Sequence, residues 1–412
     1  MSFRAEQLQV KNTYKAILTL ALPISVSIFI PQLNILTNTI FLGNYQPKQF
    51  LLSTSEMLSA SGVAGIYYLT LVMICYGLGA GSLMLMSRKA GEKNEQGMQQ
   101  LFANGVVLSV ALSGILMGIS YILAPPLFRA TLHNASIADS AISFLHIRCW
   151  GLPFIAVCQL CNSFFLALSL SRLIIYGSIV QTIVNIGFDY LLIFGNARFP
   201  EMGLEGSALA SVFADASFFI VSIFIVWQSP ALQKARDAVR MHLDKQIIKR
   251  IFLKSLPIMI QYFLSIGAWE VFFIFVEHLG KTESALSQIY RSVFGVVGIA
   301  AWSLGSTCNS MVSNLIGQQA FAEVLPLIKK IIRVSFLVAF IVGLPVLLFP
   351  SYFLAWMTAD TELVKAGISS LRIVVLATWM LSVSSILFHA VLGIGKTTWN
   401  MVFEGIAILF YL

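Results

Sequence analysis

Charged residues are scarce in this sequence. Asp, Glu, Lys and Arg make up 11% of its 412 residues, apolar residues make up 58%, and the mean hydropathy is +0.85. A soluble domain has roughly 25% charged and roughly 45–50% apolar residues. So large an apolar surplus cannot be hidden inside a water-soluble globule of this size. We therefore predict an integral membrane protein whose surface lies largely in lipid.

Histidine and cysteine are also scarce, with five residues of each. No histidine falls in an HExxH motif or a ligand-spaced cluster, and neither a P-loop nor a nucleophile elbow is present. Cys158 and Cys161 form a CxxC without a second pair, which is a weak metal signal. We therefore expect no catalytic residues and no enzyme. A membrane-embedded enzyme remains the least favoured alternative.

Eleven apolar runs are long enough for helices in a bilayer, which takes about 20 helical residues to cross. The first run is too long for the hydrophobic region of a signal peptide. The runs predict an N-terminal lobe at 1–227, a basic cytoplasmic linker at 228–250 and a C-terminal lobe at 251–412. They lie near 16–43, 57–87, 101–124, 143–169, 173–194, 203–227, 251–279, 284–316, 327–349, 368–392 and 397–412.

The basic residues give the chain a net charge of +8, but they flank apolar segments and do not form one patch. We therefore expect no nucleic-acid partner. If the N-terminus is cytoplasmic, 18 of the 26 Lys and Arg residues fall in segments on that side. Because cytoplasmic loops carry an excess of Lys and Arg, we predict a cytoplasmic N-terminus.

Landmarks recur in the two halves. Leu22-Pro23-Ile24 opens the first run, and Leu256-Pro257-Ile258 opens the seventh. Gly91 and Gly317 end the second and eighth runs, and Arg172 and Lys396 follow at nearly equal distances. Both halves start on the predicted cytoplasmic side. We therefore predict an all-α polytopic protein of two six-helix lobes related by a pseudo-twofold axis along the membrane normal.

At these landmarks the chain resembles the multidrug and toxic compound extrusion (MATE) family. The matching stretches include ALPISVSIFIPQLNILTNTIFLG, GLGAGSLMLMSRKAGEKN, NIGFDYLLIFG and GLEGSALAS in the first half, and LPIMIQ, SNLIGQQ and LGIGKT in the second. Family members have twelve helices. The sequence predicts a divergent bacterial member with a truncated second lobe that lacks the twelfth helix.

The resemblance implies a secondary transporter that exports amphipathic, often cationic compounds by antiport with Na⁺ or H⁺. Its two lobes would rock against each other. It implies no cofactor beyond the coupling ion, a monomer, and a multi-pass location in the bacterial cytoplasmic membrane with lipid as a partner. The alternative is a flippase of lipid-linked oligosaccharides from the same broad superfamily.

Charges inside a span are costly, so each is a candidate for function. Asp189 is the first, and Asn185 lies one helical turn before it. The family's N-lobe cation site has an Asn-x-x-x-Asp of this kind, and its hydroxyl carries over to Ser211. Many relatives have Asp where this chain has Asn38, which leaves Asp189 as the main titratable group. Burial should disfavour its charged form. The alternative role for Asp189 is a structural hydrogen-bond hub.

The second half contains Glu270 and Arg291 inside its first two runs. Glu270 aligns with the second of two acidic residues in some relatives, whereas Ser265 stands at the first. Because buried charges pair, we predict an ion pair between Glu270 and Arg291, either structural or switching. Glu277 is predicted to lie at the outer interface.

Overall fold

The computed structural model describes residues 8–44, 54–132, 134–196, 198–228, 243–357 and 360–411. Most of the predicted basic linker, at 229–242, lies outside the described residues. Peptide groups in lipid must hydrogen-bond within their own segment, which favours helices. The described chain is accordingly helical. Its helices are α1 (Tyr14–Asn44), α2 (Thr54–Gly91), α3 (Glu95–Thr131), α4 (Ala135–Cys149), α5 (Leu152–Ala167), α6 (Arg172–Phe194), α7 (Gly203–Gln228), α9 (Lys245–Leu279), α10 (Lys281–Gly317), α11 (Phe321–Leu348), α12 (Pro350–Met357), α13 (Thr361–Ile394) and α14 (Thr397–Tyr411).

The apolar runs correspond closely to these helices, with one break. The run at 143–169 is divided into α4 and α5, which are bent by 47° relative to each other. Within the described residues, eight helices are long and apolar enough to span a membrane, or nine if this bent pair is one span. The two other runs, α10 and α14, do not meet that measure.

Helix α10 is polar because it lies inside the molecule. One stretch of it carries six fully buried polar side chains, and α10 packs against α1, α2, α9, α11 and α13. Ser303 hydrogen-bonds to α1, Asn309 and Ser310 to α2, and Ser313 to α13, so these polar groups do not face lipid. The buried polar residues are Ser303, Thr307, Asn309, Ser310, Ser313 and Asn314.

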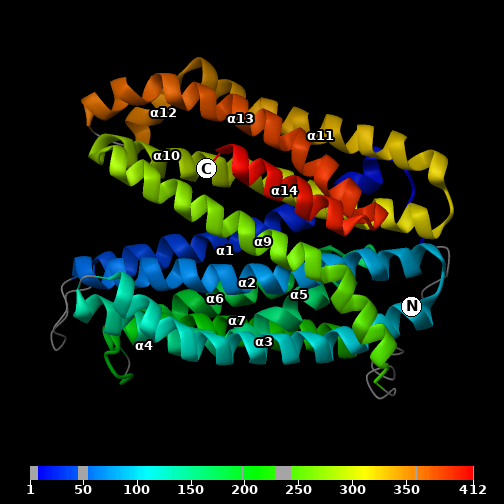
Figure 1. Ribbon diagram of the computed structural model, residues 1–412, viewed down its shortest axis with the longest axis horizontal. Coiled ribbons are helices and arrows are strands. Elements are labelled where there is room, and N and C mark those ends of the chain that lie inside the picture. The colour runs from blue at the N-terminus through cyan, green and yellow to red at the C-terminus, as the bar shows by residue number, and fades with distance from the viewer. Residues whose placement is uncertain are drawn as a thin grey trace.

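The helices form two groups. Figure 1 shows α1–α7 together on one side and α10–α14 on the other, with α9 crossing from the first group to the second. α9 packs against α2 and α3 as well as α10 and α14. Its N-cap residue Asp244 donates its backbone N–H to Asn104 Oδ1 of α3 at 2.9 Å. This two-lobe architecture confirms the predicted fold class.

The lobes meet where the ends of α2 and α10 cross. A Cβ added at Gly91 would lie 2.0 Å from the carbonyl oxygen of Asn314, and one added at Gly317 would lie 2.1 Å from that of Arg88. The two contacts are reciprocal, since each glycine faces the residue three positions before the other. Glycine is required at both positions for the two backbones to approach this closely.

The same reciprocity extends along the interface between the lobes. In the repeat, Ser25 of the first half corresponds to Met259 of the second, because each lies two residues after the matching proline, Pro23 or Pro257. Gly77 corresponds in the same way to Ser303, because each lies 14 residues before the matching glycine, Gly91 or Gly317. Ser25 Oγ lies 2.6 Å from Ser303 Oγ, and a Cβ at Gly77 would lie 2.7 Å from the Cα of Met259. Equivalent positions therefore form equivalent contacts, as a pseudo-twofold axis requires.

The segment that precedes α1 is fastened across this crossing. Val10 donates its backbone N–H to Asn314 Oδ1 at 3.0 Å, and Asn314 Nδ2 donates to the Leu8 carbonyl at 2.8 Å. Gln9 Nε2 donates to the Gly91 carbonyl at 3.0 Å. Leu8 is 1% exposed. We call residues 8–12 the N-terminal strap, because they hold the ends of α2 and α10 together.

The glycine crossing can be tested by substitution. Gly91→Ala and Gly317→Ala should each lower the melting temperature in detergent, because overpacking costs roughly 1–3 kcal/mol. The matched control is Gly62→Ala in α2, where an added Cβ has no neighbour within 4 Å. It should be neutral or slightly stabilising. Unchanged melting of all three variants would contradict the required close approach.

Candidate functional site

Two polar pairs, each spaced by one helical turn, lie on adjacent helices of the first lobe. α6 carries Asn185 and Asp189, and α7, which packs along it, carries Ser211 and Asp215. Asp189 is 0% exposed, and Asn185 and Asp215 are each 2% exposed. Asn185 Nδ2 donates to Ser211 Oγ at 3.5 Å. The structure therefore buries the predicted residues of α6 and brings one of them to the predicted hydroxyl.

The fourth predicted residue, Asn38, belongs to α1. This helix packs along α6, where Ser178 Oγ donates to the Ser27 carbonyl at 3.3 Å and Thr182 Oγ1 to the Ile30 carbonyl at 3.5 Å. The side chain of Asn38 itself lies outside the described residues. Its convergence with Asp189 therefore stays a prediction.

Asp215 forms a buried ion pair with Arg148, the penultimate residue of α4. Arg148 Nη1 lies 2.5 Å from Asp215 Oδ2, and the two side chains are 15% and 3% exposed. Gln181 Nε2 donates to Asp215 Oδ1 at 2.9 Å. The guanidinium also lies over the Tyr68 ring, 4.1 Å from its centroid. Both carboxylate oxygens of Asp215 are thus engaged within the protein.

The break between α4 and α5 makes room for this pair. α4 ends at Cys149, and Gly151 precedes α5, which has a proline in its first turn. A Cβ at Gly151 would lie 2.4 Å from Arg148 Nη1 and 2.7 Å from Asp215 Oδ2. The bend and the glycine therefore place a guanidinium inside the helix bundle, next to α7.

The charges of this cluster do not cancel. Asp189, Asp215 and Arg148 together carry one net negative charge when all three are ionised, and the charge of Arg148 acts on both carboxylates. Because uncompensated charge is costly in a buried site, the cluster is suited to take up one further positive charge. Asp189 is the fully buried carboxylate of this cluster on α6, and it is the candidate to receive that charge.

The sequence prediction omitted Arg148. The residue lies in HIRCWG, within the apolar run at 143–169, and an intramembrane arginine is by itself a signal of function. Arg148 lies outside the stretches that carry the family's cation site, so only its place in the apolar run marks it. Asp215 lies one helical turn after Ser211 and was not among the predicted site residues.

The charge of Arg291 acts on Glu270 in the second lobe, but the two side chains do not form the predicted ion pair. Among the described side chains no ion pair joins Glu270 to Arg291. The Arg291 guanidinium instead lies over the rings of Trp269 and Phe273, 4.7 and 5.6 Å from their centroids. Trp269 and Phe273 share one face of α9, and Glu270 is turned about 100° around the helix from Trp269. The side chain of Glu277 lies outside the described residues.

A different carboxylate occupies the neighbourhood of Ser265. Ser265 Oγ donates to Glu404 Oε1 of α14 at 2.5 Å, although Ser265 was expected to mark a missing acidic position. Glu404 lies in the final apolar run and was not predicted. Among its described side chains the second lobe therefore contains two partly buried carboxylates, Glu270 and Glu404, on helices α9 and α14, which pack together.

The two-lobe fold with this buried cluster can be compared with known proteins. The family model described as MatE matches residues 23–191 and 257–412. The chain belongs to the MatE family. Members of this family are transporters and not enzymes.

Curated relatives of this chain include MatE proteins of several bacteria. It is 24% identical over 295 residues to the probable multidrug resistance protein YoeA of Bacillus subtilis, covering 71% of this chain and 62% of that protein. It is 26% identical over 331 residues to the probable multidrug resistance protein NorM of a Synechocystis species, covering 77% and 70%. The chain thus spans less than two thirds of the first of these relatives.

Solved structures share the fold over nearly the whole chain. The crystal structure of MATE in the bent conformation aligns with a TM-score of 0.85 at 17% identity, covering 98% of this chain and 87% of that one. The outward-facing conformation of a multidrug resistance MATE family transporter of the MOP superfamily aligns with a TM-score of 0.78 at 17% identity, covering 100% and 98%. These likenesses show that this chain has the MatE fold.

The buried ion pair predicts strong energetic coupling between its members. Asp215→Asn or Arg148→Gln alone should destabilise the protein by roughly 3–5 kcal/mol, because the partner charge is left uncompensated. The double variant should lose clearly less than the sum of the two. The measurement is thermal unfolding of all four proteins in detergent.

The matched control is the exposed pair Arg129–Asp139, whose side chains are 66% and 62% exposed. Removing either member should change stability by about 0.5 kcal/mol or less. Additive losses at Arg148 and Asp215, equal to those at the exposed pair, would refute the buried pair.

Proposed function

We propose that this chain is a secondary transporter that exports amphipathic, often cationic organic compounds from the bacterial cytoplasm by antiport with a cation. The observation that carries the proposal is Asp189, a fully buried carboxylate in the first lobe of a MatE fold. An acidic residue inside a membrane span is a functional candidate by default. The relatives named as multidrug resistance proteins support the substrate class.

In this proposal Asp189 receives the incoming cation. With all three side chains ionised, the cluster of Asp189, Asp215 and Arg148 carries one net negative charge, so entry of a cation neutralises the cluster. Cation release would restore the net negative charge inside the lobe. The two charge states differ in their electrostatic energy in a buried site. That difference would shift the equilibrium between the two relative orientations of the lobes that the rocking motion connects.

We further propose that the cation is a proton. A proton needs one carboxylate oxygen, whereas a hard metal ion needs a shell of several oxygen ligands. Both Asp215 oxygens are engaged by Arg148 and Gln181. Asn38 carries an amide where many relatives carry a carboxylate, which removes a charged oxygen ligand. The cluster is therefore better suited to a proton than to Na⁺.

Rocking of the lobes would open the crossing of α2 and α10. The contacts that must separate are the reciprocal backbone approach at Gly91 and Gly317 and the hydrogen bonds of the N-terminal strap to Asn314. These are short-range contacts between two pre-formed helices and between the strap and one of them. They can break without unfolding either lobe.

The experiment is efflux of a fluorescent amphipathic cation from proteoliposomes under separately imposed gradients. We expect a pH gradient to drive transport and a Na⁺ gradient at equal pH to drive none. Asp189→Asn should lose the proton-driven component, because an amide cannot take up a proton at ordinary pH. Asp139→Asn, an exposed position, is the matched control and should transport normally.

Two outcomes would contradict parts of this account. Na⁺-driven efflux by the unmodified protein at equal pH would contradict proton coupling but leave Asp189 in place. Proton-driven efflux that persists in Asp189→Asn would remove Asp189 from the coupling site. Thermal unfolding of each variant in detergent shows whether a loss of transport reflects a loss of folded protein.

A further inference from the structure

A cavity of about 190 Å³ lies between the end of α2 and the starts of α3 and α9. Its inner wall is apolar, and its rim carries four charged side chains. The lining combines residues of the first lobe with the first turns of α9, the helix that leads into the second lobe. The apolar wall is formed by Leu85, Leu101 and Ile247, and the charged rim by Arg88, Lys89, Glu92 and Arg250.

The rim has an excess of positive charge. Lys89 Nζ lies 2.6 Å from Glu92 Oε2, so the single carboxylate of the rim is already paired. Arg88 and Arg250 are close enough to repel each other. Arg250 takes part in none of the ion pairs among the described residues. The described rim thus carries three basic side chains against one carboxylate, which is paired with Lys89 and also acts on Arg88.

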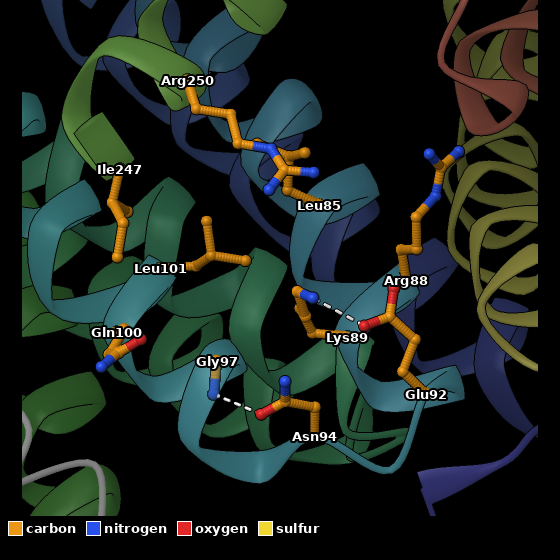
Figure 2. A pocket seen from close by; sticks show the side chains of 10 residues that line it. All are labelled: Leu85, Arg88, Lys89, Glu92, Asn94, Gly97, Gln100, Leu101, Ile247 and Arg250. Atoms are coloured by element: carbon orange, nitrogen blue, oxygen red, sulfur yellow. Dashed lines mark hydrogen bonds and ion pairs between the residues drawn. The ribbon is translucent and has the colours of Figure 1, made fainter.

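Arg88 adds an unsatisfied donor. Its Nη2 donates to the Ile394 carbonyl of the second lobe at 3.0 Å, but its Nε is buried and has no acceptor in the described structure. Figure 2 shows Arg250 reaching from α9 toward Leu85, while Arg88 extends away from the Lys89–Glu92 pair. The charged groups therefore enter the site from separate helices, α2 and α9.

This combination fits one ligand chemistry. Arginine and lysine together bind phosphate, arginine through its planar fork and lysine as a point charge. The site lies at the end of α2 where basic residues follow an apolar span, which is the expected level of lipid headgroups. Basic pockets between helices at this level bind anionic headgroups. The apolar wall would accept the hydrocarbon next to such a group.

We propose that this cavity binds a phosphate ester, held by Arg250 and Lys89 with Arg88 at its edge. The ester is either the headgroup of an anionic phospholipid or a free phosphate compound. Because Arg250 belongs to α9 and Lys89 to α2, the ligand bridges helices of the two halves. Its binding stabilises the arrangement in which Arg88 reaches Ile394 across the interface between the lobes.

The test is the melting temperature of the purified protein in neutral detergent, titrated with phosphatidylglycerol, with phosphatidylethanolamine of the same chains, and with inorganic phosphate. Phosphatidylglycerol should raise the melting temperature saturably and phosphatidylethanolamine should not. A matching rise with inorganic phosphate assigns the site to free phosphate compounds. A rise with phosphatidylglycerol alone assigns it to lipid.

Charge variants separate this site from general attraction to anionic lipid. Lys89→Gln and Arg250→Gln should each weaken the apparent affinity about fivefold. Glu92→Gln should strengthen it, because the rim loses its only negative charge. Lys249→Gln is the matched control, since Lys249 is exposed, adjoins Arg250 and does not line the cavity. It should leave the affinity unchanged.

Three results would overturn the proposal. The first is that Lys249→Gln weakens the apparent affinity as much as Arg250→Gln does. The second is that both phospholipids raise the melting temperature equally. The third is that neither phosphatidylglycerol nor inorganic phosphate raises it. If Arg250→Gln melts early without added lipid, Glu92→Gln still decides, because its predicted effect has the opposite sign. All readouts are binding measurements, so the outcome does not depend on transport.

Discussion

Helices α2 and α10 approach to backbone contact at Gly91 and Gly317, and this close crossing constrains the rest of the molecule. Two backbones at this distance leave no room for side chains, so packing and hydrogen bonds to carbonyls must hold the halves together. Asn309 Nδ2 of α10 donates to the Ala80 carbonyl at 3.1 Å, and Ser310 Oγ adds a hydroxyl–hydroxyl hydrogen bond to Ser87 Oγ at 3.0 Å. The polar interior of α10 follows from this position.

The two halves make equivalent backbone contacts, but their buried polar and charged side chains differ. The first lobe contains a buried ion pair, Arg148–Asp215, beside Asp189. In the described part of α9–α14, the ion pair Lys365–Glu362 is exposed, and Glu270 and Glu404 are only partly buried. Two halves with one architecture thus differ in charge. This difference supports the proposal that the cation site lies in the first lobe.

Much of the fold could be predicted from the sequence, because lipid requires helices and the glycine and proline landmarks recur in order. The break after Cys149 was not predicted, although Gly151 and Pro153 in that run are residues that often interrupt a helix. Predicting contacts was harder than predicting elements. Glu270 and Arg291 lie at suitable depths, but a difference of one residue turns a side chain about 100° around its helix, and Arg291 faces Trp269 instead.

The candidate site could be predicted only in part for a related reason. Asn185 and Ser211 meet as the family motif implies. Arg148 comes from α4, far from that motif in sequence, and only tertiary packing brings it to Asp215. A charged residue outside a known motif can be recognised from its position inside an apolar run. The residue that pairs with it cannot be identified from the sequence in the same way.

The central claim is that Asp189 exchanges a proton for substrate. Its most direct test is proton release when an amphipathic cation such as ethidium is added to purified protein in weakly buffered detergent solution. Because linkage between two ligands is reciprocal, saturating substrate should release about one proton per unmodified protein and none from Asp189→Asn. Equal release from both proteins, or saturable binding to the unmodified protein with no release, would contradict the claim.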